Sequence, residues 1–102
     1  MKIILIYDIS HDNTRNKIAD LCQDYGLDRV QYSSFEGALR RTHQEELMLK
    51  IRKKLGKRAG DVRLIPICEK DWENRLHLRN EEPAPAQSSA NGQGDQKKGQ
   101  AG

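Results

Sequence analysis

Acidic and basic side chains near the start of the chain could together handle a metal ion and a phosphate. Asp8 ends an apolar run, Asp12 follows in the next turn, and Arg15 and Lys17 come directly after. Carboxylate oxygens are ligands that Mg²⁺ accepts while keeping water in the rest of its shell. An arginine at a helix N-terminus can pair with a phosphate, although an exposed helix residue looks the same in sequence. One Asp8 alone is a sparse site, so we expect two copies of it to meet across a homodimer axis.

Simpler explanations apply to the neighbouring polar residues. Asp12 or Asn13 is expected to cap the helix that follows, and His11 to lie in an exposed loop. The spacing of acids and histidines fits neither an EF-hand nor a zinc site. The segment 56–60 is basic and bounded by glycines. It lacks the Gly-Lys-Ser/Thr ending of a Walker loop and is expected to be a flexible basic loop.

Charge is distributed unevenly along the chain. Residues 40–63 contain nine Lys and Arg but three acids, whereas residues 8–28 contain five Asp and two cations. Such polarity suits a protein that holds phosphate on one surface and a cation on another. The alternative is a solvated, lysine-rich helix face, and charge alone favours neither. The candidate nucleic-acid contacts are Lys50, Arg52, Lys53, Lys54, Lys57 and Arg58.

The first strand and helix are expected to position Asp8. The unbroken apolar run 3–7 predicts a strand buried on both faces. An apolar stripe then predicts a helix that Gly26 closes in a left-handed conformation. The stripe consists of Ile18, Leu21, Cys22 and Tyr25.

The remaining elements follow from the same patterns. Residues 27–39 predict two short strands that turn near Ser33 and Ser34. Thr42 and Glu45 match a capping box, which predicts a second helix ended by Gly56. Its buried stripe would be Leu47, Met48, Ile51 and Leu55. Residues 61–68 predict a strand that either lies at an edge or loses its pairing at Pro66, because proline cannot donate a ladder hydrogen bond. Residues 72–78 predict a further short strand or arm.

This order predicts an α+β, ferredoxin-like β-α-β-β-α-β fold. Right-handed crossovers would place the first and third strands in the middle of a four-stranded antiparallel sheet, with both helices on one face. The uncovered face of so small a core favours a homodimer. We expect one folded domain over residues 1–80. Residues 81–102 are expected to be a disordered tail, because they lack large apolar side chains.

Cysteine usage and hydropathy bear on the compartment. Cys22 and Cys68 have no Cys-x-x-Cys spacing and are expected to be small buried residues in a reducing cytoplasm. The only apolar N-terminal run is too short for a signal peptide or a membrane span. We therefore expect a cytoplasmic protein with no membrane partner.

The fold alone does not give a function, because many functions share it. An RNA-recognition module of this strand order stacks bases on aromatic residues of its middle strands. The chain has five aromatic residues and lacks the aromatic block of that module. An acylphosphatase-like site would need an arginine directly after the first strand, where Asp8 stands instead.

Four segments carry a more specific likeness. They are Leu5–Ile9, Asp12–Arg15, Tyr25–Gly37 and Leu64–Ile67. Their combination of Tyr-Asp-Ile with Gln-Tyr-Ser-x-Phe-Glu-Gly, in this order and spacing, resembles the CRISPR-associated protein 2 family over residues 1 to 80. This is the small protein that accompanies the spacer-integration enzyme of CRISPR systems. One departure is Ser34, where the family often has Val, and it concerns packing more than chemistry.

The resemblance implies a ferredoxin-like homodimer in which Asp8 binds Mg²⁺ or another divalent cation at the dimer centre. It also implies that further residues form or support the site: Tyr7, Arg15, Arg29, Ser33 and Phe35. The family is described both as metal-dependent endonucleases on RNA or DNA and as non-catalytic bridges between integrase dimers on duplex DNA. Spacer acquisition, with the CRISPR-associated integrase as partner, is therefore the expected process. A toxin-like nuclease outside CRISPR would use the same residues.

Overall fold

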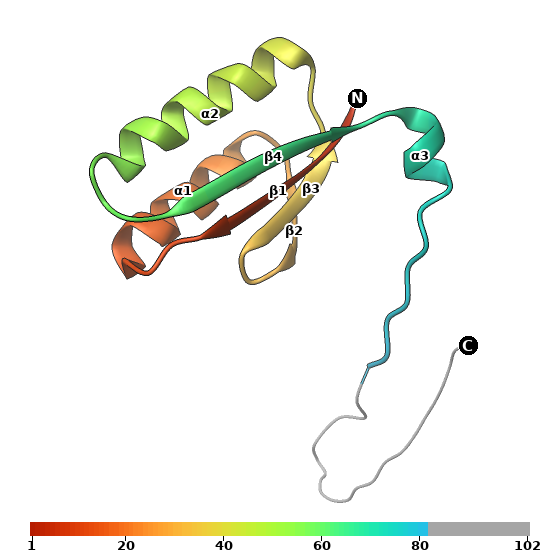
Figure 1. Ribbon diagram of the computed structural model, residues 1–102, viewed down its shortest axis with the longest axis horizontal. Coiled ribbons are helices and arrows are strands. Elements are labelled where there is room, and N and C mark those ends of the chain that lie inside the picture. The colour runs from red at the N-terminus through yellow and green to blue at the C-terminus, as the bar shows by residue number, and fades with distance from the viewer. Residues whose placement is uncertain (82–102) are drawn as a thin grey trace, which may run out of the picture.

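The computed structural model describes residues 1–81, so the predicted disordered tail lies outside the described residues except for Glu81. Four strands and two long helices form the domain, and a short helix follows (Figure 1). The elements are β1 (Lys2–Asp8), α1 (Asp12–Asp24), β2 (Asp28–Gln31), β3 (Ser34–Ala38), α2 (Arg41–Leu55), β4 (Asp61–Ile67) and α3 (Glu69–Glu73). This order confirms the predicted β-α-β-β-α-β pattern.

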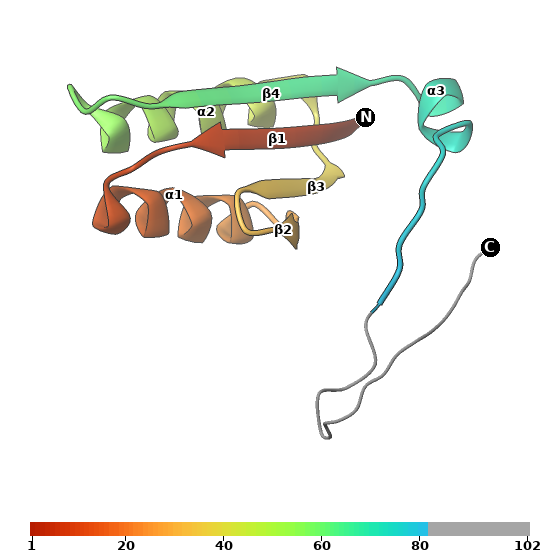
Figure 2. The same cartoon turned by 60° about the horizontal axis from the view of Figure 1, so that its bottom comes forward.

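The strands form one antiparallel sheet in the order β2-β3-β1-β4. The first and third strands are therefore central, as predicted, and β4 with Pro66 is an edge strand. Both α1 and α2 cover the same face (Figure 2). The opposite face of the sheet therefore has no helical layer within the described residues.

Side chains alternate along β1 between these two faces. Ile3, Leu5 and Tyr7 point to the helices and are buried, whereas Ile6 on the other face is 43% exposed. The prediction that this strand is buried on both faces is therefore wrong for the single chain. The helices contribute the predicted stripes to the core, with fully buried members Ile18, Cys22, Leu47 and Ile51.

The helix ends are as predicted, but the helix starts are not. Gly26 has φ +80° directly after α1, and Gly56 ends α2. At the start of α1 the cap is His11, whose Nδ1 accepts a hydrogen bond from the Thr14 N–H, so Asp12 and Asn13 are already helical. The helix α2 begins at Arg41 without a side-chain cap. Thr42 is thus inside the helix, and the predicted capping box does not form.

The end of the described chain also differs from its prediction. Residues 69–73 form the helix α3, and residues 74–81 leave the sheet without forming a strand (Figures 1 and 2). The predicted strand over 72–78 is therefore absent, although the segment does extend as an arm. Cys68 caps α3 and is exposed, which corrects the expectation that both cysteines are buried. Cys22 is buried, and desolvation raises the pKa of its thiol to about 12. None of the helices within residues 1–81 has the length and hydropathy to cross a lipid bilayer.

Candidate functional site

The polar residues singled out in the sequence gather at one end of the sheet. The register places Asp8, the last residue of β1, opposite Asp61, the first residue of β4. On the other side of β1, the Tyr7 N–H donates to Ser33 O in the β2–β3 turn at 3.0 Å. The start of α1 follows β1 directly. The end of β1, the β2–β3 turn and the starts of β4 and α1 therefore meet here.

Asp8 and Asp61 form a carboxylate pair on the open face of the sheet. Both residues are exposed, and directly opposed residues of antiparallel strands share a face. Asp61 is paired with Arg63 of its own strand at 3.2 Å, whereas Asp8 has no side-chain hydrogen bond within residues 1–81. Like charges placed opposite one another repel, so a cation between them would be favourable. Asp61 was not singled out in the sequence, because only the strand register brings it to Asp8.

One protomer supplies a sparse set of metal ligands. Residues 1–81 contain no group of three or more His, Cys, Asp or Glu side chains that could hold a metal ion. Mg²⁺ commonly uses one or two carboxylates and retains several waters, so the oxygen donors of Asp8 and Asp61 fit this ion. A second copy of the same pair would complete the donor set.

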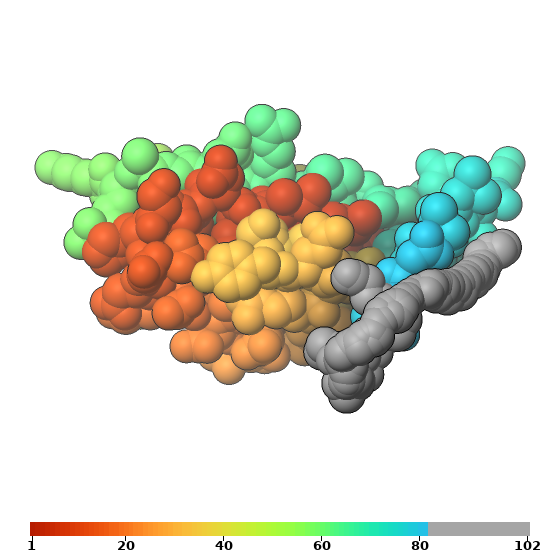
Figure 3. Space-filling view, turned by 90° about the horizontal axis from the view of Figure 1, so that it is seen from below, coloured from red at the N-terminus to blue at the C-terminus, as the bar shows by residue number. Residues whose placement is uncertain are grey.

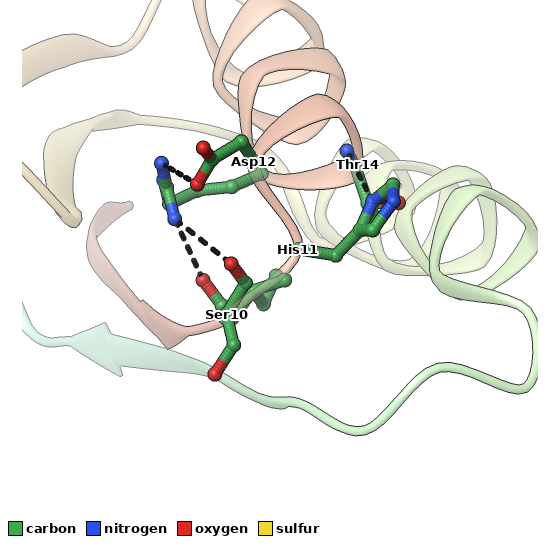
Figure 4. A network of polar contacts seen from close by, with 6 residues as sticks. Ser10, His11, Asp12 and Thr14 are labelled. Carbon is green, nitrogen blue, oxygen red and sulfur yellow. Dashed lines mark hydrogen bonds and ion pairs between the residues drawn. The ribbon is translucent and has the colours of Figure 1, made fainter.

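Arg15 holds the loop that follows Asp8. Its Nη1 donates to the carbonyl oxygens of Ile9 (3.1 Å) and Ser10 (3.4 Å), and its Nη2 pairs with Asp12 at 2.7 Å (Figure 4). The hydrogen bond to Asp12 raises the pKa of Arg15. Its side chain is only 17% exposed, so it is not the exposed helix residue of the alternative interpretation. These contacts fix the backbone on which Asp8 stands.

The His11 side chain is bound to Thr14 and is not free in a loop. Its Nδ1 lies 2.9 Å from Thr14 Oγ1 in addition to accepting from the Thr14 N–H (Figure 4). The residue is half-buried, which corrects the expected exposed loop. His11 therefore closes the first turn of α1 and secures the same loop as Arg15 from the other side.

The other residues implied by the resemblance divide into buried and exposed ones. Tyr7 and Phe35 are 2% and 0% exposed, and their rings stack with centroids 6.2 Å apart. The Tyr7 hydroxyl accepts from Arg29 Nη2 at 3.3 Å and donates to Tyr32 O at 3.4 Å. Arg29 is exposed and lies 5.2 Å from the Phe35 centroid. Tyr7 and Phe35 thus support Arg29 from below, and Ser33 contributes its backbone carbonyl.

The six predicted nucleic-acid contacts are all exposed on the last turns of α2 and the loop after it. Lys50 differs from the others because it lies over the Tyr25 ring at 5.2 Å, and its interaction with Tyr25 raises its pKa. The loop reaches the acidic end of the sheet. A Cβ added at Gly60 would lie 3.0 Å from Ile9 Cγ1 and 3.6 Å from Asp8 O. The loop after α2 therefore returns to the end of β1 and leads into Asp61.

Comparisons with known proteins bear on this arrangement. The sequence profile of the family described as CRISPR associated protein Cas2 matches residues 1–75. A relative named CRISPR-associated endoribonuclease Cas2 2, from Chloroflexus aurantiacus, is 41% identical over 81 residues, which are 79% of this chain and 95% of that protein. A protein of Thermoproteus tenax named CRISPR-associated endonuclease Cas1/endonuclease Cas2 fusion is 27% identical over 82% of this chain and 32% of its own length.

The fold is also found in a solved structure. The crystal structure of Streptococcus pyogenes Cas2 superposes with a TM-score of 0.65 at 21% identity, and the match covers 78% of this chain and all of that one. This likeness concerns the fold. Together with the profile match and the relative from Chloroflexus, it confirms the resemblance seen in the sequence. The chain belongs to the CRISPR-associated protein Cas2 family.

Proposed function

We propose that the protein is a homodimeric, Mg²⁺-dependent endonuclease of CRISPR adaptation that hydrolyses RNA or DNA phosphodiesters. The observation that carries this proposal is the carboxylate pair of Asp8 and Asp61, exposed on an open sheet face with Arg63 beside Asp61. The names of the relatives support it, because they are called endoribonucleases and, in Thermoproteus, a fusion with Cas1. The integrase is accordingly the proposed protein partner.

The open face of the sheet supports a homodimer. Ile6 and Ile65 lie on it and are 43% and 44% exposed, and Ile4 and Ile67 beside them are half-buried. Ile4 lies opposite Ile65, whereas Ile6 lies opposite Arg63 and Ile67 opposite Lys2. The apolar stripe therefore runs diagonally across β1 and β4 and ends next to Asp8. Contiguous exposed apolar surface typically marks a protein interface. A two-fold axis near the end of this stripe would bring two carboxylate pairs together.

Each side chain then has a role in hydrolysis. Asp8 and Asp61 would hold the cation, which when bound supplies a Lewis acid for the phosphate and makes a bound water more acidic. Arg29 is exposed at the same end of the sheet, on its helical side, and would bind a phosphate next to the one that is cleaved. Arg15 has both Nη groups committed to Asp12 and to two carbonyls, and its Nε is buried, so it positions Asp8 instead of binding the phosphate.

Metal removal tests the proposed activity. Purified protein incubated with a labelled single-stranded RNA is expected to cleave it in Mg²⁺ and to lose at least about 100-fold in rate in excess EDTA, because charge stabilisation and water activation disappear together. Excess Mg²⁺ should restore the rate. Cleavage at an undiminished rate in EDTA would contradict the proposal.

Charge introduced on the open face tests the dimer. The variant Ile6→Glu is expected to elute as a monomer at micromolar concentration in size-exclusion chromatography with light scattering, since it places a carboxylate in the apolar stripe. Its cleavage activity should fall with the loss of the second carboxylate pair. The matched control Leu49→Glu changes an exposed residue of α2, which is 59% exposed on the helical layer, and should remain dimeric. A dimeric, fully active Ile6→Glu protein would contradict this arrangement.

The exposed basic cluster favours a second candidate function. Its lysines and arginines are suited to sequence-independent contacts with the phosphates of a duplex, which do not read the base edges. A protein with this surface could bridge integrase subunits on duplex DNA without cutting it, and the Thermoproteus fusion is compatible with such a pairing. Asp8 would then be dispensable, and this difference separates the two functions.

A further inference from the structure

Tyr32 is an aromatic side chain that the fold presents to solvent. It lies in the turn between β2 and β3 and is 65% exposed, although a tyrosine ring ordinarily gains stability by burial. In the space-filling view, the β2–β3 segment lies on the surface directly beside the start of α1 (Figure 3). This turn belongs to the same end of the sheet as Asp8.

Two guanidinium groups flank the Tyr32 ring. The Cζ atoms of Arg15 and Arg29 lie 5.2 and 5.7 Å from its centroid. Both distances are within the range of a cation–π interaction. The backbone is held as well, because the Tyr7 hydroxyl donates to Tyr32 O at 3.4 Å and the adjacent Ser33 O accepts from the Tyr7 N–H. The ring is therefore held in position without being covered.

The two arginines differ in the donors they have left. Arg15 uses its Nη groups on Asp12 and on the carbonyls of the preceding loop. Arg29 makes one hydrogen bond, to the Tyr7 hydroxyl, and no carboxylate of residues 1–81 forms an ion pair with it. An exposed aromatic ring thus stands beside a guanidinium with free donors. A planar base and its phosphate would match these two groups.

We propose that Tyr32 is a stacking platform for an unpaired nucleobase, with Arg29 binding the adjoining phosphate. The proposal rests on the proposed function, since it specifies that the nucleic acid bound at this site is single-stranded. A base in a duplex has both faces covered by its neighbours, so only an unpaired one can lie on the ring. Stacking of this kind tolerates any base, because every base has a π face.

The position of Tyr32 allows it to act in the dimer. Arg29 pairs across the sheet with Phe35, which faces the helices, and Arg15 belongs to α1. The ring is therefore associated with the helical side, whereas the proposed dimer uses the opposite face. A strand stacked on Tyr32 would lead past the end of β1, where Asp8 stands.

Binding measured without metal tests this inference separately from cleavage. A fluorescein-labelled oligouridylate is titrated with the full chain in EDTA and followed by fluorescence anisotropy. Tyr32→Ala is expected to weaken binding by about 5- to 150-fold, which is the range for loss of one stacked base. Tyr32→Phe keeps the ring and should bind like the unchanged protein. The matched control Val30→Ala truncates an exposed side chain of β2, 47% exposed, and should also bind normally.

A blunt-ended RNA duplex provides the specificity control, and its affinity should be the same for Tyr32→Ala and the unchanged protein. A 2-aminopurine in the oligonucleotide should lose fluorescence on binding, because stacking quenches it, and should keep it with Tyr32→Ala. The inference is overturned if Tyr32→Ala binds the single strand normally, if it loses equal affinity for the duplex, or if the unchanged protein does not bind the single strand. If the protein binds the single strand through Tyr32 but never cleaves it, the proposed nuclease activity is refuted and the stacking site is still supported.

Discussion

Replacing Asp8 by asparagine is expected to reduce Mg²⁺-dependent cleavage at least about 100-fold, because the amide keeps the shape of the side chain and removes its charge. The fold should not change. Asp8 is exposed at the end of β1 and makes no side-chain hydrogen bond within residues 1–81, so the free energy of unfolding should stay within about 0.5 kcal/mol. Initial cleavage rates, measured beside thermal unfolding and elution volume, separate a lost site from a lost structure.

A matched variant distinguishes position from charge. Asp20→Asn removes the same charge from an exposed position on α1 and should cleave at the normal rate. The partner variant Asp61→Asn should lose activity as well, by about tenfold, if both carboxylates contribute to the cation site. Cleavage that survives in Asp8→Asn would end the nuclease proposal for this protein.

The same variant bears on the adaptor role. An adaptor containing Asp8→Asn should still bind duplex DNA, with an affinity that falls steeply as salt rises. Neutralising Lys53 and Lys54 to glutamine should then weaken duplex binding across all sequences and flatten the salt dependence. Salt-independent binding, or binding indifferent to these two substitutions, would contradict an adaptor that grips the phosphate backbone.

Periodicity and turn chemistry were enough to predict most of the fold. The apolar run of β1, the stripes of α1 and α2 and the glycines after each helix depend on local sequence, and the structure has all of them. Pro66 also placed β4 correctly at an edge. The predicted helix starts were wrong: Thr42 and Asp12 are favourable caps by residue type, but His11 caps α1 and α2 begins at Arg41 without a side-chain cap. In place of the strand expected over 72–78, the chain has the end of α3, which Cys68 caps, and then an extended segment.

The site was less predictable, because its partners are far apart in sequence. Asp8 stood out at the end of an apolar strand, but Asp61 becomes its neighbour only through the register of β1 with β4. Arg15 could equally have been an exposed helix residue until its contacts to the carbonyls after β1 were known. Tyr32 belonged to the family motif, but nothing in the sequence indicated its exposure, since an aromatic residue in a strand-rich segment usually belongs to the core. Its exposure depends on where the β2–β3 turn falls.

Replacing Phe35 by alanine is expected to lower the free energy of unfolding by about 3–5 kcal/mol, a large part of the stability of a small domain. Phe35 lies on the central strand β3, is 0% exposed, and stacks against Tyr7. Removing its ring leaves a cavity and takes away the surface on which Arg29 rests, 5.2 Å from the centroid. Urea unfolding at a fixed protein concentration measures the loss, and the fixed concentration matters because the proposed dimerisation would add to apparent stability.

The variant Phe35→Leu tests whether Phe35 only supports Arg29 or contacts the substrate directly. Leucine restores most of the apolar volume, so the loss should shrink to about 1–2 kcal/mol. If Phe35 acts by positioning, this folded variant should keep the Asp8-dependent cleavage rate and lose affinity only through the displaced Arg29. A Phe35→Ala protein as stable as the unchanged one but inactive would instead mean that the ring meets the substrate. Complete burial argues against that result, because a side chain with no exposed surface can influence a nucleic acid only through the residues that it supports.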